Sequence, residues 1–404
     1  MRRIVLLVAV GITAAAATVG TATAAPSHAR ITHKNIHVCG SPAAGKASCN
    51  AIRHDTFVNG KAAPQATAPG GFNPADLQSA YNLPSATAGS GQTVAIVDAY
   101  DDPKAEADLA TYRAQFGLPA CTTANGCFRK VNQSGGTRMP RANGGWAQEI
   151  SLDLDMVSAT CPNCHILLVE ASSSSMTSLG AAVNEAAKLG ATEISNSYGG
   201  GESSSDPSYD TSYFNHPGVA ITVSTGDSGY GVEYPAASQY VTAVGGTSLQ
   251  RNSTVSRGWS ESVWSTTSTE GAGSGCSRYD ARPSWQSSVS NISSVCAKRA
   301  VADVSAVADP YTGVSVYDSY SYQGYSGWLV FGGTSVASPI IASVYALAGN
   351  ASAVSYGSYP YVQSTSLNDV TSGQTASCGS DLCSAAAGWD GPTGLGTPNG
   401  TGAF

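Results

Sequence analysis

The chain has 404 residues, of which 42% are hydrophobic and only 12% are charged, so it can bury a large core beneath a sparsely charged surface. Intrinsic disorder is excluded, because disordered chains combine high net charge with few aromatic residues and this chain has 19 Tyr and 6 Trp. The formal net charge of -7 argues against nucleic acid as a partner, since phosphate binding requires clustered Lys and Arg.

Residues 1–24 have the pattern of a secretory signal peptide. Arg2 and Arg3 form a basic start, an apolar run follows over residues 4–17, and Ala22-Thr23-Ala24 fits a small-residue cleavage site. A membrane anchor is the alternative, but the run is short for a span that needs about 20 residues. We therefore expect a secreted, extracellular protein with no membrane association after the signal is removed.

Residues 25–70 differ in composition from the rest of the chain. They hold five Lys or Arg against one acidic residue, together with four of the six histidines: His28, His33, His37 and His54. From residue 71 onward, 13 basic residues stand against 26 acidic ones. We interpret residues 25–70 as a flexible tail or as a short basic pro-segment held electrostatically against an acidic domain at 71–404. Because histidine gains charge below about pH 6.5, we expect release in acid, with self-cleavage near residues 60–72.

From residue 93 onward, short apolar runs alternate with helical patterns. Strands are predicted at 93–97, 164–169, 191–195, 219–223, 240–244 and 328–331, and helices at 146–159, 179–189 and after 334. Continuous apolar strands alternating with helices predict an α/β fold with a parallel sheet covered on both faces. Functional residues should then gather at the carboxyl ends of the strands.

The ten cysteines fall into five closely spaced pairs. These are Cys39/Cys49, Cys121/Cys127, Cys161/Cys164, Cys276/Cys296 and Cys378/Cys383, which in an exported chain predict local disulfides. Cys161 and Cys164 also match the C-x-x-C-H spacing of haem attachment and could bind zinc. No second pair of zinc ligands is near and no set of apolar helices supports haem, so a disulfide is favoured.

A candidate nucleophile lies in Gly332-Gly333-Thr334-Ser335. The glycines permit a tight turn after a strand, and a nearly all-apolar helix follows, with Pro339 early enough to be tolerated. A serine at a helix N-terminus lies beside free backbone N–H groups that can hold developing negative charge. Ser335 is therefore either a nucleophile or an N-cap serine.

A nucleophilic serine needs a base, and that base is usually histidine. After residue 70 the only histidines are His165, inside an apolar strand, and His216, before a proline, so a Ser-His-Asp triad is poorly supported. Glu149 and Asp153 lie four residues apart, on one face of the predicted helix. Two such carboxylates would share a proton, which lets Glu149 accept the Ser335 proton while Asp153 orients it. A solvated acidic helix face is the alternative.

A third acid, Asp227, follows a predicted strand within Gly226-Asp227-Ser228-Gly229. A protonated carboxyl group in this place could donate a hydrogen bond to an oxyanion. The alternative is an aspartate that caps its own turn.

These segments together resemble the sedolisin family of serine-carboxyl peptidases. The E-x-x-x-D helix is matched by Glu149 and Asp153, the glycine-flanked aspartate by Asp227, and the G-T-S-x-x-x-P segment by Gly333 to Pro339, in the family's order. The resemblance implies a subtilisin-like three-layer α/β sandwich with a mainly parallel central sheet. It implies that Ser335 is the nucleophile, Glu149 the base and Asp153 its tuning partner, and that Asp227 holds the oxyanion.

The C-terminal region resembles the family's calcium loop. The resemblance implies one structural calcium held by the carboxylates of Asp369 and Asp390 and by the backbone carbonyls of Val370, Ala386 and Gly388. These oxygen donors, completed by water, suit calcium. The family usually has glycine where Ala386 stands.

The length of the N-terminal segment departs from the family, and one further acid is explained by comparison with subtilisins. Sedolisins commonly carry a large folded pro-domain, whereas about 45 residues separate the signal from the domain here. Asp98 ends the first predicted strand, where subtilisins keep a triad aspartate, and Glu149 stands where subtilisins have histidine. We interpret Asp98 as structural or as a support to the catalytic residues.

The sequence thus predicts a secreted, calcium-stabilised serine-carboxyl endopeptidase that acts in acid on protein or peptide substrates, as a monomer. The alternative is a catalytically silent subtilisin-fold protein that binds a partner or the cell wall. An esterase is disfavoured, because the G-x-S-x-G pattern is absent around Ser335.

Overall fold

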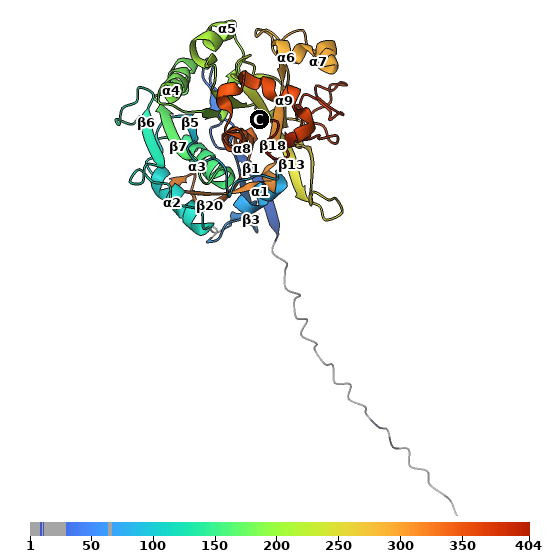
Figure 1. Ribbon diagram of the computed structural model, residues 1–404. Helices are drawn as coiled ribbons and strands as arrows, with labels where there is room; N and C mark the ends of the chain where they lie inside the picture. Colours follow the sequence, from blue (N-terminus) through green and yellow to red (C-terminus); the bar gives the residue numbers. More distant parts are fainter. Residues whose placement is uncertain (1–8, 10, 12–29, 64–66) are drawn as a thin grey trace, which may run out of the picture.

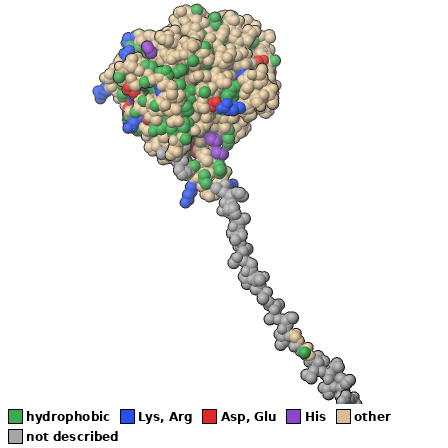
Figure 2. Space-filling model, turned by 60° about the horizontal axis from the view of Figure 1, so that its bottom comes forward, with side chains coloured by type: hydrophobic (Ala, Val, Ile, Leu, Met, Phe, Trp, Pro, Cys, Tyr) green, Lys and Arg blue, Asp and Glu red, His purple; other side chains and the backbone are tan. Residues whose placement is uncertain are grey.

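A computed structural model describes residues 9, 11, 30–63 and 67–404 (Figure 1). The predicted signal peptide, apart from residues 9 and 11, lies outside the described residues. Within those ranges, no helix combines the length and the apolar character that a membrane crossing requires. Uncharged side chains predominate on the face shown in Figure 2, as the low share of charged residues predicts.

The centre of the domain is an eight-stranded sheet. Its strands run in the order β14 (Trp259–Val263), β13 (Thr242–Arg251), β10 (Ala220–Ser224), β8 (Glu193–Asn196), β5 (Thr93–Ala99), β7 (His165–Ala171) and β6 (Phe128–Asn132), with β18 (Val304–Val307) also paired to β13. All these pairings are parallel except that of β13 with β14. The predicted mainly parallel sheet is confirmed.

Helices cover both faces of this sheet. Val94 and Ile96 of β5 pack with side chains of α3 (Gly144–Thr160) and α8 (Thr334–Ala348). The alternate residues, Ala95 and Val97, belong to the core cluster that holds α4 (Met176–Lys188). Because successive strand residues point to opposite faces, this alternation gives the three layers of an α/β sandwich. The helices α1 (Pro74–Ala80) and α2 (Ala105–Gln115) pack beside α3.

Smaller elements surround the sandwich. They are β11 (Ser228–Tyr230), β12 (Glu233–Tyr234), β15 (Ser265–Thr267), β16 (Glu270–Cys276), β17 (Ala300–Val301), β21 (Leu367–Asn368), β22 (Thr397–Pro398), α5 (Asp206–Tyr209), α6 (Ser284–Ser287), α7 (Ser290–Val295) and α9 (Tyr359–Val362).

The predicted elements are present, with shifted ends. The helix predicted at 146–159 begins at Gly144, because the side chain of Asn143 accepts hydrogen bonds from the first backbone N–H groups. The strand predicted at 240–244 continues to Arg251 through two glycines that resemble a turn in the sequence. Its antiparallel pairing with β14 holds this extension in place.

The described part of the basic N-terminal segment is folded into the domain and does not hang from it as a flexible tail. It forms β1 (Ile31–His37), β2 (Ser48–Cys49), β3 (Ile52–Val58) and β4 (Lys61–Ala62). β1 pairs with β3, and β3 joins β20 (Tyr325–Gly332), which pairs with β19 (Val314–Tyr322). β2 pairs with β9 (Tyr198–Gly201). The sequence pattern does not reveal these strands, because β1 and β3 carry many polar and charged side chains and β2 and β4 have only two residues each.

All five predicted disulfides form, and no cysteine is free. Cys161 and Cys164 bond to each other, which removes both thiols from zinc or haem binding.

Candidate active site

Ser335 is the second residue of α8, directly after a turn that only glycine tolerates. Gly333, the residue before the helix, has φ +92°, and a Cβ there would collide with the carbonyl oxygen of Asn50. The side chain of Ser335 is fully buried. The tight turn thus brings the Ser335 hydroxyl and the free N–H groups of the helix start to one point.

Glu149 is positioned to accept the proton of Ser335. The Oγ of Ser335 donates a hydrogen bond to Oε2 of Glu149 at 2.9 Å, and lies 3.2 Å from the carbonyl oxygen of Ser197. Glu149 lies on α3, which packs directly against α8. The predicted pairing of a serine with a carboxylate is therefore present in the structure.

Asp153 lies one turn further along α3 and interacts with Glu149. Its Oδ1 accepts a hydrogen bond from Oγ of Ser197 at 2.9 Å. Oε1 of Glu149 and Oδ2 of Asp153 are buried without any N–H or O–H partner among the described residues. A proton shared between the two carboxyl groups satisfies both atoms. Burial, and then the charge of Asp153, hold the pKa of Glu149 well above its usual range.

Asp98, at the end of β5, is a third buried carboxyl group at this site. It is 0% exposed, neither of its oxygens has a hydrogen-bond partner in the part of the chain that the structure describes, and burial raises its pKa to about 8. Its charge also contributes to the raised pKa values of Glu149 and Asp153, after the larger effect of burial on each. This electrostatic contact agrees with Asp98 supporting the catalytic residues.

Asp227 faces the start of α8 from the loop after β10. Its Oδ1 accepts hydrogen bonds from both N and Oγ1 of Thr334, each at 2.8 Å. Its Oδ2 is buried and receives none from the described residues. Burial raises the pKa of Asp227 to about 6. Below that pH, Oδ2 carries a proton that it can donate beside Ser335.

None of the histidines weighed in the sequence is placed to act as a base. His165 lies exposed at the start of β7, and Nε2 of His216 contacts Oδ1 of Asn184 at 2.8 Å. Instead His37, from the N-terminal segment, lies near Asp227 and lowers the pKa of that carboxyl, against the larger effect of burial. No local pattern in the sequence connects His37 with Asp227, so this contact could not be predicted from the sequence.

The five residues predicted to bind calcium gather in one C-terminal region. Oδ2 of Asp369 accepts from N of Gly388 at 2.9 Å, and Oδ2 of Asp390 accepts from N of Ala386 at 3.1 Å. Val370, the remaining predicted ligand, follows Asp369 in the chain and is buried. Burial and, less strongly, the charge of Asp369 raise the pKa of Asp390 to about 7. These hydrogen bonds bring the segments that carry the two predicted carboxylate ligands together, and the calcium site itself stays a prediction.

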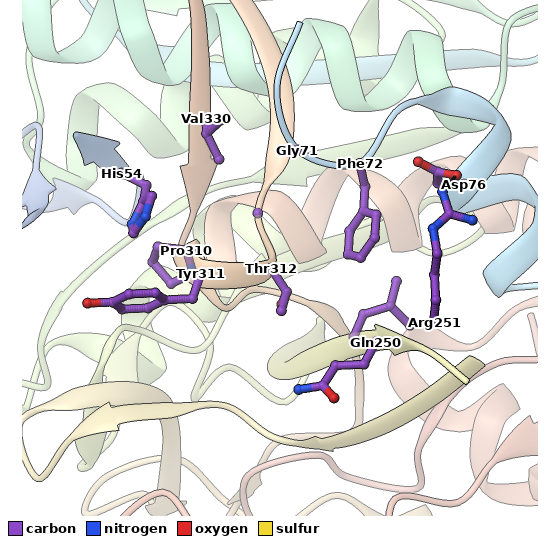
Figure 3. A pocket seen from close by; sticks show the side chains of 12 residues that line it. His54, Gly71, Phe72, Asp76, Gln250, Arg251, Pro310, Tyr311, Thr312 and Val330 are labelled. Atoms are coloured by element: carbon purple, nitrogen blue, oxygen red, sulfur yellow. Dashed lines mark hydrogen bonds and ion pairs between the residues drawn. The ribbon is translucent and has the colours of Figure 1, made fainter. Parts of the chain in front are cut away.

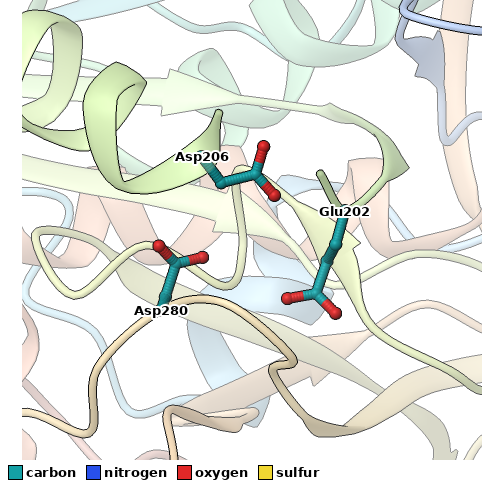
Figure 4. A group of neighbouring side chains, drawn as sticks. All are labelled: Glu202, Asp206 and Asp280. Carbon is teal, nitrogen blue, oxygen red and sulfur yellow. The ribbon is translucent and has the colours of Figure 1, made fainter. Parts of the chain in front are cut away.

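A separate acidic group is formed by Glu202, Asp206 and Asp280 (Figure 4). Their carboxylate oxygens lie within 4.8 Å of one another, and both oxygens of Asp280 are buried without a hydrogen-bond partner among the described residues. Burial, and then the charges of neighbouring acids, raise the pKa of Asp280 to about 8. These residues are not among the predicted calcium ligands, and we assign them no ligand.

Two cavities differ in their relation to the site. One of about 550 Å³ is lined by His54, Phe72, Arg251 and Tyr311 among others, and none of the four predicted catalytic residues reaches it (Figure 3). A second, of about 300 Å³, is lined by Asp227 and by Asn50 of the N-terminal segment. The second cavity therefore belongs to the candidate active site.

Comparison with known proteins places the chain among peptidases. A model of the subtilase family matches residues 136–381. Kumamolisin from Bacillus sp. (strain MN-32) is 31% identical over 372 residues, covering 83% of this chain and 63% of kumamolisin. Sedolisin from Pseudomonas sp. (strain 101) is 28% identical over 372 residues, covering 81% and 60%. The chain thus spans roughly three fifths of the length of these curated relatives.

A solved structure supports the same relationship. Pseudomonas sedolisin, described as a serine-carboxyl proteinase complexed with two molecules of pseudo-iodotyrostatin, matches with a TM-score of 0.68 and 26% identity. The match covers 83% of this chain and 96% of that one. The segment that the family model matches also holds all four predicted catalytic residues, from Glu149 to Ser335. The chain therefore belongs to the subtilase family and, within it, to the sedolisins.

Proposed function

We propose that this protein is a secreted serine-carboxyl endopeptidase that hydrolyses peptide bonds in acid through an acyl-enzyme on Ser335. The observation that carries the proposal is the 2.9 Å hydrogen bond from Oγ of Ser335 to Oε2 of Glu149. It pairs a nucleophile with a base in a buried site, and no histidine is needed because Oγ of Ser335 donates directly to the carboxylate.

In the proposed mechanism, Oγ of Ser335 attacks the scissile carbonyl carbon while Glu149 takes the hydroxyl proton. The oxyanion accepts hydrogen bonds from the backbone N–H of Ser335 and from protonated Asp227. Glu149 then returns its proton to the leaving amine, and the C–N bond breaks. Water repeats the sequence on the acyl-enzyme, with Glu149 again as the base. Asp153 acts only through the proton that it shares with Glu149, and Asp98 acts only through its electrostatic effect on that pair.

Acid action follows from the protonation states that this mechanism requires. Asp227 must carry a proton to donate to the oxyanion, and its pKa is raised to about 6. The pair of Glu149 and Asp153 must hold one proton, so that one carboxyl group is ionised without placing two charges side by side. We therefore expect activity to fall as the pH rises through roughly 5 to 7.

We also propose that calcium stabilises the enzyme without taking part in catalysis. The ion would be held by the carboxylates of Asp369 and Asp390 and by the carbonyls of Val370, Ala386 and Gly388. The hydrogen bonds that already tie Asp369 to Gly388 and Asp390 to Ala386 support this set. Secretion is proposed from the signal-peptide pattern and agrees with the five disulfides.

The test is hydrolysis of denatured casein from about pH 3 to pH 8 with calcium present, a range that spans the titration of the carboxyl groups. We expect wild-type activity confined to acid, no measurable activity in Ser335→Ala, and a loss of about 10²- to 10⁴-fold in kcat in Glu149→Gln. Activity that survives Glu149→Gln contradicts the carboxylate mechanism. Folded protein that is inactive at every pH supports the silent binding or cell-wall protein instead.

A further inference from the structure

The N-terminal segment lies directly over the candidate active site. β2 pairs antiparallel with β9, the strand that begins one residue after Ser197. Before it, the N–H of Ala47 donates to the carbonyl of Ser174 at 2.8 Å. Ser335 and Glu149 have no exposed surface. A peptide from another molecule cannot reach Ser335 while this segment is in place.

The peptide group of Asn50 lies between the nucleophile and the oxyanion aspartate. Its N–H donates to the carbonyl oxygen of Ser197 at 3.1 Å, and the same oxygen lies 3.2 Å from Oγ of Ser335. Its own carbonyl oxygen packs against Gly333, where an added Cβ would also lie 2.8 Å from Oδ2 of Asp227. The Asn50 carbonyl therefore sits where the mechanism needs a scissile carbonyl.

The residues after Asn50 continue along the other side of the site. Ile52 and Arg53 pair antiparallel with Gly332 and Phe331, at the end of the strand that leads into Ser335. Residues on both sides of the Asn50–Ala51 bond are thus held by backbone pairing to the strands that flank the nucleophile. Strand addition of this kind is a general way in which proteins hold an extended peptide.

We propose that residues 46–53 are bound as an intramolecular substrate, with Asn50–Ala51 as the bond that Ser335 cleaves. This inference rests on the proposed peptidase function. Ser335 Oγ bonds to the Asn50 carbonyl carbon, and the proton taken up by Glu149 passes to the nitrogen of Ala51 as the C–N bond breaks. Water then releases a carboxyl group at Asn50 and restores the Ser335 hydroxyl. Ala51, not a residue between 60 and 72, becomes the first residue of the processed chain.

The same register identifies the pocket that receives the side chain before the cleaved bond. Nδ2 of Asn50 donates to Oγ of Ser224 at 2.9 Å, and the side chain also hydrogen-bonds Glu233. Burial raises the pKa of Glu233 to about 7, so in acid the pocket presents a carboxylic acid and a hydroxyl. The oxygens of these groups suit a small polar side chain with N–H donors and disfavour a large apolar one. The pocket therefore selects peptides with asparagine, or a similarly small polar residue, before the scissile bond.

The fold keeps the two cut ends together after cleavage. β1 and β3 pair over seven residues on opposite sides of the bond, from Ile31 with Val58 to His37 with Ile52. The Cys39–Cys49 disulfide also ties the end of the leaving fragment to its own loop. Cleavage alone therefore does not open the site, and the fragment that ends at Asn50 inhibits the enzyme until the β1–β3 pairing separates.

The experiment follows the purified full-length protein by intact mass spectrometry and N-terminal sequencing after transfer from pH 7.5 to pH 4. We expect a chain that begins at Ala51, formed at a rate independent of protein concentration, and no such chain in Ser335→Ala. New N-termini only between residues 60 and 72, or an Ala51 terminus in Ser335→Ala, would overturn the proposal.

A matched pair of variants tests the pocket. Asn50→Phe places an aromatic ring at the cleaved bond, whereas Ala44→Phe places the same ring on an exposed position of the same segment. With both variants shown to be folded by their melting temperatures, we expect Asn50→Phe to slow formation of the Ala51 terminus at least tenfold and Ala44→Phe to leave it unchanged. Equal rates in the two variants exclude the assigned pocket.

Casein hydrolysis separates failure of this inference from failure of the proposed function. Casein cleaved in acid by a chain that never acquires an Ala51 terminus leaves the peptidase intact and refutes the intramolecular substrate. Folded wild-type protein that cuts neither casein nor itself refutes both.

Discussion

At the scale of single residues, the site depends on carboxyl groups that keep protons at unusually high pH. Glu149, Asp153 and Asp98 are each 0% exposed, so removal of water disfavours their charged forms. After burial, the charges of Asp153 and Asp98 raise the pKa of Glu149, and the charge of Asp98 raises the pKa of Asp153. A histidine in place of Glu149 would gain charge in acid and lose its function as a base, whereas a pair of carboxyl groups that shares a single proton still offers one ionised oxygen.

Asp227 offers a test of the oxyanion contact. Asparagine at this position keeps an oxygen for the Thr334 hydrogen bonds and an N–H donor for the oxyanion, but it cannot titrate. Asp227→Ala should lower kcat by about 10²- to 10³-fold, the usual cost of losing one oxyanion donor. Asp227→Asn should lose less of kcat than Asp227→Ala does. As the pH rises, its activity should begin to decline at a higher pH than that of the wild type. Steady-state pH profiles of both variants measure this, and an unchanged decline in Asp227→Asn contradicts a protonated Asp227.

Single residues also show which parts of the site can be predicted from local sequence patterns. Glu149 and Asp153 are found from their spacing on one helix, and Ser335 from the glycine turn before an apolar helix. Asp98 is singled out by its place at the end of the first predicted strand, and Ser197 has no local signal. The distance of either residue to Ser335 depends on which strands are neighbours in the sheet. The position of Asn50 is the hardest to predict from the sequence. It depends on the N-terminal segment, whose strands β1 and β3 have no apolar period.

At the scale of elements, the β1–β3 hairpin is the part that acid should loosen. His33 and His54 stack with ring centroids 4.8 Å apart, and His54 also packs against Tyr311. Burial, and then the charge of His33, lower the pKa of His54, while Asp309, Asp55 and Glu270 oppose that shift. The closed hairpin therefore binds fewer protons at His54 than the open one, and loses stability as the pH falls below about 6.5.

His37 acts in the opposite sense on the same hairpin. The hydrogen bond that the His37 ring donates to Glu270 is the largest cause of its raised pKa, so this contact strengthens in acid. We expect His54→Gln to keep the hairpin closed to lower pH than in the wild type, with His216→Gln as a control outside the hairpin. Hydrogen exchange of the β1 amides at pH 4 and pH 7, corrected for intrinsic rates and measured on Ser335→Ala protein, tests this. Equal acid-induced exchange in both variants contradicts it.

The C-terminal loop carries the prediction about calcium. A ligand at a hundredfold excess over its Kd stabilises a protein by about 2.7 kcal/mol. We expect calcium to raise the melting temperature of the wild type by several degrees and to lose this effect in Asp390→Asn. Asp381→Asn, a change in the same loop outside the predicted ligand set, should respond like the wild type. Scanning fluorimetry with calcium or with chelator gives the comparison, and a full calcium response in Asp390→Asn excludes the proposed site.

At the scale of the whole molecule, buried acids make stability depend on pH. Asp98, Glu193 and Asp318 are each 0% exposed, and burial raises the pKa of each to about 8. The folded protein therefore holds more protons than the unfolded chain between about pH 4 and pH 8. By linkage, the free energy of unfolding falls as the pH rises through that window.

Because the free energy of unfolding falls as the pH rises, we expect the protein to be most stable in acid. With calcium held constant, the melting temperature of Ser335→Ala protein should decrease from pH 4.5 to pH 7.5, and Glu193→Gln should reduce that decrease. Scanning fluorimetry across this range measures the effect. A melting temperature that rises with pH would show that the acids are ionised in the folded state.

The sequence by itself determined the α/β class, the five disulfides and the four catalytic candidates, because each is encoded by neighbours in the chain. Alternation of apolar strands and helices predicts a parallel sheet, and a fixed spacing brings Glu149 and Asp153 to one helix face. Only the tertiary structure decided which residues surround these groups. Strand order brings Asp98 to Glu149, and non-local backbone pairing lays Asn50 across Ser335. Such contacts arise between segments far apart in the chain, where burial and pairing across the whole fold decide the neighbours.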